Sequence, residues 1–149
     1  MIVLDASVVI DLLLDVAPVS DRIAEHVRAH DGDLHAPHLL DAEVGQVFRR
    51  FILRGDLTAE RAHRAIERLG GLPLTRYPHL PFLHRALELR GNLTVYDALY
   101  LVLAEALGAP LLTRDEAIAS APGDVSVIVV DGHSGREESR TLPVGILPR

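Results

Sequence analysis

Short apolar runs alternate with amphipathic stretches along most of the chain. Short apolar runs are typical of buried strands, whereas apolar residues spaced three or four positions apart predict helices. This alternation indicates a parallel sheet covered by helices on both faces, so the chain is predicted to be α/β, with a central parallel five-stranded sheet flanked by helices. Strands are predicted over 1–4, 34–36, 72–77, 109–113 and 125–130, and helices over 7–14, 20–30, 39–53, 58–69, 80–90, 94–108 and 114–121.

The segment TVYDALYLVLAEALG, residues 94–108, is apolar on nearly every side except at Asp97. A helix of this kind is normally buried, and a buried, unpaired carboxylate is costly. Asp97 follows Thr94 at the spacing of a capping box, which places the carboxylate near the positive end of the helix. A metal ion that supplies the counter-charge is a second explanation, and this segment leaves both open. Tyr96 and Tyr100, one helical turn apart, are predicted to be packing or dimer residues.

Three further acidic residues are expected at the same edge of the sheet as Asp97. Asp5 ends the first predicted strand, Asp115 follows the fourth, and Glu43 lies near the start of the helix after the second strand. Ligands of open α/β sheets bind at the carboxyl ends of the strands. The four carboxylates are therefore predicted to converge.

Each of these acids also has a structural explanation. Asp5 or Ser7 can cap the helix that follows, the run Thr113–Glu116 matches a second capping box around Asp115, and Glu43 can be solvated. Taken together, however, carboxylates about 4 Å apart repel by roughly 4 kcal/mol at an effective dielectric constant of 20. A converging set therefore either binds a cation or becomes partly protonated. If a cation is bound, oxygen ligands favour Mg²⁺ or Mn²⁺. One or two such ions are typical of phosphodiester hydrolysis.

The absence of two residue types excludes several kinds of chemistry. The chain has no cysteine, which excludes disulfides, thiolate nucleophiles and cysteine-based zinc sites, and a cytoplasmic location is expected. It also has no lysine. Receiver domains and haloacid-dehalogenase-like phosphatases also place an aspartate after the first strand, but they need a lysine beside the phosphoryl group. A GxxxxGK[ST] nucleotide loop is excluded for the same reason.

The distribution of charge limits the possible partners. A net charge of -6 argues against broad, charge-driven nucleic-acid binding but not against a local basic rim. Arg114, beside Asp115, is the best candidate to hold a phosphate, because its planar fork pairs with phosphate oxygens. A solvated arginine without a ligand is the alternative for this residue. Near the N-terminus Asp5 and Asp11 interrupt the apolar run and no basic region precedes it, so neither a signal peptide nor a membrane span is expected.

A zinc site formed by histidines is an alternative to the carboxylate site. The spacing i, i+4 can place His26 and His30 on one helical face. No glutamate lies between them and no acidic third ligand is in register, so roles at the surface or at the edge of the core are favoured. The four histidines considered are His26, His30, His35 and His38.

Three stretches of the chain carry a family resemblance: VLDASVVIDLLL, LLDAEVGQVFRR and LTVYDALYLVLAEALGAPLLTRDEAI. They resemble the PIN-domain ribonucleases, specifically the toxin halves of VapBC-type toxin–antitoxin pairs. The resemblance runs from Met1 to about Val130. It implies a PIN-like α/β/α sandwich over residues 1–131, with residues 132–149 as a C-terminal extension whose order stays open.

The resemblance also implies an activity and partners. It implies an endoribonuclease that depends on Mg²⁺ or Mn²⁺, cuts tRNA or ribosomal RNA, forms a homodimer and is inhibited by a small antitoxin lying over the active site. Gln46 departs from the asparagine of many relatives, and Glu116 is an alternative to Asp115. A catalytically inactive PIN-like module that binds RNA or protein, and a free-standing RNA-processing nuclease, are the alternative functions. By position, the catalytic and metal-binding acids are Asp5, Glu43, Asp97 and Asp115, and Ser7 and Thr113 match small hydroxyl residues that support the site. Glu116 is counted with the supporting residues because it follows Asp115 directly, and Arg114 stays the candidate for binding substrate on the grounds given above.

Overall fold

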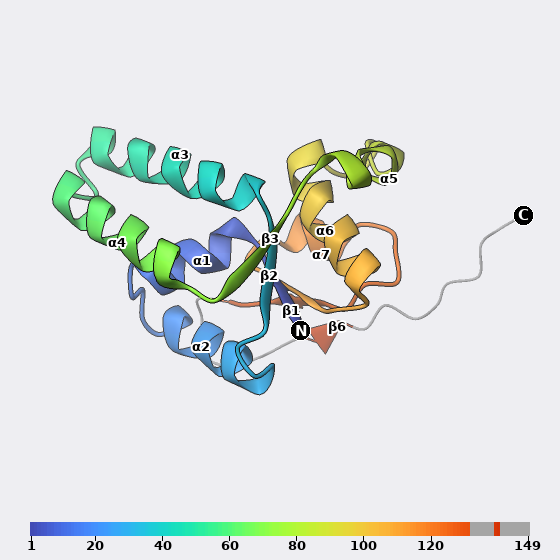
Figure 1. Cartoon of the computed structure of the whole chain (residues 1–149), viewed down its shortest axis with the longest axis horizontal. Helices are drawn as coiled ribbons and strands as arrows, with labels where there is room; N and C mark the ends of the chain where they lie inside the picture. Colours follow the sequence, from blue (N-terminus) through green and yellow to red (C-terminus); the bar gives the residue numbers. More distant parts are fainter. Residues whose placement is uncertain (132–138, 141–149) are drawn as a thin grey trace, which may run out of the picture.

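A mainly parallel sheet forms the centre of the molecule (Figure 1). The computed structural model describes residues 1–131 and 139–140. Within these residues the strand order is β3-β2-β1-β4-β5-β6; neighbouring strands from β3 to β5 are parallel, as predicted, and β6 is antiparallel to β5. The strands are β1 (Ile2–Leu4), β2 (Leu34–Pro37), β3 (Leu74–Tyr77), β4 (Leu111–Thr113), β5 (Val127–Val129) and β6 (Ser139–Arg140).

Helices cover both faces of this sheet, which confirms the predicted three-layer arrangement. Helices α1 to α4 lie on one face and α5 to α7 on the other (Figure 1). None of the helices in the described ranges is both long and apolar enough to cross a bilayer. The helices are α1 (Ala6–Leu13), α2 (Val19–Ala29), α3 (Leu39–Arg54), α4 (Ala59–Gly71), α5 (Leu83–Glu88), α6 (Val95–Leu107) and α7 (Glu116–Ala119), with a 3₁₀ turn η1 (Leu80–Phe82) before α5.

The hydrophobic core lies between the sheet and the two helical layers. All residues of β1, β2 and β4 are buried, as expected for parallel strands covered on both faces. Helix α6 is buried without interruption from Ala98 to Ala104, which explains why its sequence is apolar all round. In α3 the buried residues are Leu40, Val44 and Phe48, and Val47 and Phe51 are partly buried.

Local signals set most of the helix boundaries. Helices α3 and α6 end at Gly55 and Gly108, whose φ angles of 80° and 61° lie in the left-handed region that favours glycine. The predicted helix over 80–90 is instead divided into η1 and α5. Pro81 lies in the first turn of η1 and has no N–H to donate to a regular helical ladder.

The strand order reverses its direction at β1. Strand β1 lies between β2 and β4, so the chain leaves β1 toward one side and later crosses to begin β4 on the other. This reversal of direction is the position at which open α/β sheets bind ligands. Of the extension over 132–149, residues 139–140 pair with β5, and the remainder lies outside the described residues.

Candidate active site

Asp5 stands at the end of β1 and is 5% exposed. Its Oδ1 accepts a hydrogen bond from the Ala6 N–H at 2.8 Å, so Asp5 caps α1 as expected. Its Oδ2 accepts from the hydroxyls of Ser7 and Thr113, both at 2.7 Å. Burial raises the pKa of Asp5 in spite of these three hydrogen bonds, and the nearby charge of Asp115 adds to the rise. The three hydrogen bonds fix the orientation of the Asp5 carboxylate.

Thr113 links the ends of β1 and β4. This residue is fully buried, and its Oγ1 donates to Asp5 and accepts from the Asp115 N–H at 3.0 Å. Asp115, not Thr113, is the N-cap of α7, with Oδ1 accepting from the Ala117 N–H at 2.9 Å. The capping box over Thr113–Glu116 was therefore wrong: the helix begins only at Glu116, and the Thr113 hydroxyl accepts from the Asp115 N–H, two residues on, instead of capping the helix. Glu116 begins α7 and is exposed.

Asp97 lies in the first turn of α6, close to other acids of the cluster. Thr94 caps α6, and its Oγ1 accepts from the Asp97 N–H at 3.2 Å. Burial, followed by the negative charges of Asp5 and Asp115, raises the pKa of the Asp97 carboxyl group. The carboxylate therefore lies in the first turn of α6 and also within electrostatic range of the acids that follow β1 and β4.

Glu43 joins the same cluster from α3. Burial raises its pKa, a hydrogen bond from Tyr100 lowers it, and the charges of Asp5 and Asp97 raise it further, with a net rise. The Tyr100 hydroxyl donates to Glu43 Oε1 at 2.8 Å, and burial foremost raises the pKa of this tyrosine, which keeps it protonated. Gln46, one turn after Glu43, is exposed.

Tyr100 is a site residue that the sequence prediction missed. It is fully buried, which agrees with a packing role, but its hydroxyl also fixes Glu43. The only available signal was its spacing of i, i+3 from Asp97, which places both residues on one face of α6. A buried tyrosine hydroxyl normally finds a polar partner, and here that partner is an acid of the site.

Replacing Tyr100 by phenylalanine is expected to move the acidic limb of the pH–activity profile to higher pH. The hydrogen bond from Tyr100 lowers the pKa of Glu43, so its loss raises that pKa and a higher pH is needed to ionise the carboxyl group. The measurement is kcat/KM, between pH 5 and 9, for the RNA cleavage that the family resemblance implies. Tyr96→Phe, at an exposed tyrosine on the same helix, is the matched control. An unchanged acidic limb in Tyr100→Phe contradicts the role of this hydrogen bond.

The four acids lack basic partners in the described part of the chain. The ion pairs there involve other carboxylates, and Asp5, Glu43, Asp97 and Asp115 have none. The charge of Asp115, not that of Glu116, acts on Asp5 and Asp97. No three carboxylate or imidazole groups of residues 1–131 already surround one point closely enough to hold an ion. The chemistry of these side chains nevertheless suits a hard divalent cation, because carboxylate oxygens without a basic partner are the ligands that such ions prefer.

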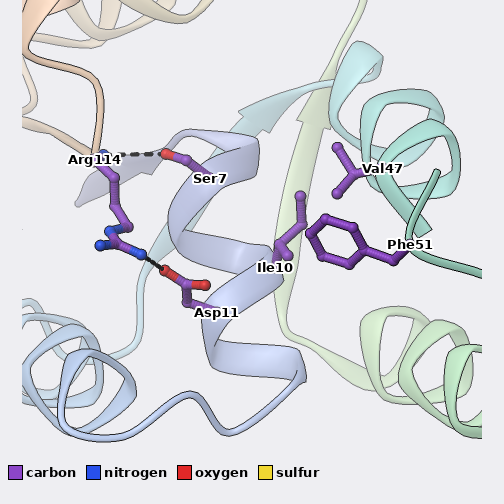
Figure 2. A pocket seen from close by; sticks show the side chains of 6 residues that line it. All are labelled: Ser7, Ile10, Asp11, Val47, Phe51 and Arg114. Carbon is purple, nitrogen blue, oxygen red and sulfur yellow. Dashed lines mark hydrogen bonds and ion pairs between the residues drawn. The ribbon is translucent and has the colours of Figure 1, made fainter. Parts of the chain in front are cut away.

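Arg114 lies beside this cluster but points elsewhere (Figure 2). Its backbone N–H donates to Ser7 Oγ at 3.1 Å, and its guanidinium group forms an ion pair with Asp11 on α1. A phosphate contact by Arg114 therefore stays a prediction.

The histidines considered for zinc have other contacts. His35 is buried, with Nε2 2.8 Å from Asp33 Oδ1 and Nδ1 2.7 Å from the Tyr77 hydroxyl. His30 Nδ1 lies 2.8 Å from the backbone oxygen of His26. Both ring nitrogens of His35 are thus engaged, and no histidine-containing group of three metal-binding side chains occurs in the described ranges.

Comparison with known proteins identifies the family. The PIN domain family model matches residues 2–124. "Ribonuclease VapC1" of Mycobacterium tuberculosis is 43% identical over 81% of this chain and 90% of its own, and "VapC ribonuclease Mb0985" of Mycobacterium bovis is 40% identical over 77% and 86%. The crystal structure of PAE2754 from Pyrobaculum aerophilum has a TM-score of 0.58 at 26% identity and covers 78% of this chain and 76% of that one. The chain therefore belongs to the PIN-domain family.

Proposed function

We propose that this protein is a toxin endoribonuclease that hydrolyses RNA phosphodiester bonds at the Asp5, Glu43, Asp97 and Asp115 site with the help of Mg²⁺ or Mn²⁺. The observation that carries the proposal is that these acids, from four separate elements, lie within electrostatic range of one another and have no basic partners in the described residues. Relatives named VapC ribonucleases, at 37–43% identity, support the activity.

The four carboxylates would hold one or two divalent ions. When bound, such an ion neutralises charge on the phosphodiester and activates the attacking water. The protein contributes orientation: Ser7 and Thr113 hold Asp5, and Tyr100 holds Glu43. Partners that orient a metal ligand commonly affect affinity or activity by about 10- to 100-fold.

The proposed partners are an RNA substrate of the tRNA or ribosomal RNA class, a small antitoxin that covers the active site, and a second copy of the chain. Two alternatives lead to different observations. A catalytically inactive PIN-like module binds RNA or protein without cleavage. A free-standing RNA-processing nuclease cleaves RNA but has no antitoxin encoded beside it.

The proposal is tested by incubating the purified protein with tRNA and ribosomal RNA in Mg²⁺, Mn²⁺ or EDTA. We expect discrete cleavage products in either metal and none in EDTA. RNA that is bound but left intact in both metals overturns the activity and supports the inactive module. Growth arrest on expression, relieved by co-expression of the neighbouring small protein, separates a toxin from a processing nuclease.

Mn²⁺ is expected to stabilise the protein at pH 7 but hardly at pH 4. The pKa values of Asp5, Glu43 and Asp97 are raised above their ordinary values, so acid protonates these ligands more readily than free carboxylates, and protonated ligands bind metal poorly. At a concentration 100 times its Kd, the ion is expected to add about 2.7 kcal/mol to the free energy of unfolding. The measurement is Tm by scanning calorimetry with and without MnCl₂. A Tm at pH 7 that does not respond to Mn²⁺ contradicts the metal site.

A further inference from the structure

A pocket of about 330 Å³ opens beside the acidic site (Figure 2). Its floor is one face of α1, because Ser7, Ile10 and Asp11 are spaced i, i+3 and i+4. Helix α3 forms one wall and the segment after β4 forms the other. The lining residues are Ser7, Ile10, Asp11, Val47, Phe51 and Arg114.

Ser7 joins this pocket to the acids. Its hydroxyl donates to Asp5 Oδ2 at 2.7 Å and accepts from the Arg114 N–H at 3.1 Å. Asp11 lies one helical turn further along α1, about 6 Å at 1.5 Å per residue. A polymer with one phosphate at the acids therefore carries its next unit over the pocket.

The two walls of the pocket differ in chemistry. Val47 and Phe51, one turn apart on α3, supply an apolar wall with an aromatic ring. On the other side Arg114 pairs with Asp11, whose side chain is only 13% exposed. The same two walls are visible on either side of α1 in Figure 2.

The charged pair has hydrogen-bonding capacity left for a ligand. Arg114 uses one guanidinium nitrogen, Nη1, and its Nε and Nη2 donate to no group of the described residues. Asp11 uses Oδ2, and its Oδ1 accepts from none there. Since every fully buried polar side-chain atom in the described ranges has a partner, this oxygen reaches solvent.

We propose that this pocket binds an unstacked nucleobase on the nucleotide next to the scissile phosphate, and that guanine fits it best; the inference rests on the proposed ribonuclease function. Single-stranded RNA is commonly recognised by bases that stack on aromatic side chains and bond along their edges. Phe51 offers the stacking surface. Arginine donors suit the guanine O6 and N7 acceptors, and the Asp11 carboxylate suits the adjacent N1–H and amino donors.

A protein segment fits the same pocket less well. An apolar side chain placed there removes water from the spare Arg114 donors and the Asp11 acceptor without replacing those hydrogen bonds. Leaving such groups unsatisfied is costly. A nucleobase satisfies both walls, because it combines an apolar face with a polar edge.

The test uses short oligomers derived from an RNA that the protein cleaves, with G, A, C, U or an abasic site on either side of the scissile bond. Wild type is compared with Phe51→Leu and Asp11→Asn, after a melting curve has confirmed that each variant is folded. Leu53→Ala is the matched control, because Leu53 is 69% exposed on the same helix and lies outside the pocket.

Wild type is expected to cleave the guanine oligomer with a kcat/KM about ten-fold above that of the abasic oligomer, the range of one base–aromatic stack. Phe51→Leu lowers cleavage of the guanine oligomer toward the abasic value and leaves abasic cleavage unchanged. Asp11→Asn reduces the preference for guanine over the other bases. The two variants probe different walls, so either result stands if the other variant fails to fold.

Equal cleavage of all oligomers by wild type overturns the pocket while leaving the ribonuclease function intact. So does Phe51→Leu if it lowers abasic and guanine cleavage alike. If no RNA is cleaved at all, the proposed function fails. Fluorescence anisotropy then measures binding of the same oligomers and tests the pocket by itself. Equal affinity for guanine and abasic oligomers overturns the pocket. Loss of a protein partner in Phe51→Leu, with base selection intact, assigns the pocket to that partner instead.

Discussion

Replacing Asp97 by asparagine is expected to lower kcat/KM for RNA cleavage by roughly 10³-fold in Mg²⁺ or Mn²⁺. The substitution keeps the shape of the side chain but removes one charged oxygen ligand. A metal ion commonly contributes several kcal/mol of transition-state stabilisation, and each 1.36 kcal/mol corresponds to a ten-fold change in rate. The measurement is initial-rate cleavage of an RNA that the wild type cuts.

The same substitution is expected to raise Tm in EDTA at pH 7. The pKa of Asp97 is raised by burial and by the charges of Asp5 and Asp115, so the folded chain binds the Asp97 proton more tightly than the unfolded chain does. The favourable contribution of the protonated group is present below the ordinary pKa of 3.8 and is lost as the pH rises through the raised value. At neutral pH the ionised carboxylate therefore opposes folding, and asparagine removes that penalty.

The difference in Tm between Asp97→Asn and wild type should accordingly shrink as the pH falls toward 4. Scanning calorimetry in EDTA across pH 4 to 8 measures it. Asp124→Asn is the matched control, because Asp124 is exposed in the loop before β5 and should change neither Tm nor cleavage. Full cleavage by Asp97→Asn removes this residue from the metal site.

Replacing Thr113 by valine is expected to destabilise the protein by about 2–4 kcal/mol. The two side chains have nearly the same shape, so the cost comes from hydrogen bonding. Asp5 Oδ2 loses a buried donor and the Asp115 N–H loses its acceptor. Asp5 Oδ2 keeps its hydrogen bond from Ser7, so the cost is that of two lost hydrogen bonds. The bond to the carboxylate contributes about 1.5–3 kcal/mol and the bond from the backbone N–H about 0.5–1.5 kcal/mol.

Activity should fall together with stability in this variant. Without Thr113 the Asp5 carboxylate is less well oriented, and the loss of such an orienting partner commonly lowers metal affinity or activity by about 10- to 100-fold. Urea unfolding and cleavage assays measure the two effects. Thr75→Val is the control, because Thr75 is exposed on β3 and its hydroxyl has no hydrogen bond in the described residues. Equal stability of Thr113→Val and Thr75→Val contradicts the proposed role of the buried hydroxyl.

The sequence predicted the order and type of the main elements because their signals are local. Thr58 and Thr94 begin helices and Gly55 and Gly108 end them, through contacts within one turn of the chain. The observed pairing of the five parallel strands β3, β2, β1, β4 and β5 confirms the predicted fold class and parallel sheet, to which β6 adds an antiparallel edge strand. The error over 80–90 was one of local geometry, where a proline-containing 3₁₀ turn precedes a short helix.

Parts of the candidate site were predicted less completely, because hydroxyl groups have several possible partners. Thr113 has the spacing of a helix cap, but a buried carboxylate 108 positions earlier in the chain is its partner. Tyr100 has the spacing of a packing residue, but it also donates to Glu43 from 57 positions away. Sequence spacing predicts contacts within one helical turn, but it does not predict contacts between residues far apart in the chain.

By itself, the sequence determined which carboxylates follow strands and which begin helices, since capping and hydrophobic periodicity act over a few neighbouring residues. Only the tertiary structure decided that β1 lies between β2 and β4, that Thr113 and Tyr100 hold Asp5 and Glu43, and that Arg114 turns toward Asp11 to form the wall of a pocket. These contacts join residues far apart in the chain, and their partners are selected by packing and by the need of buried polar groups for hydrogen bonds.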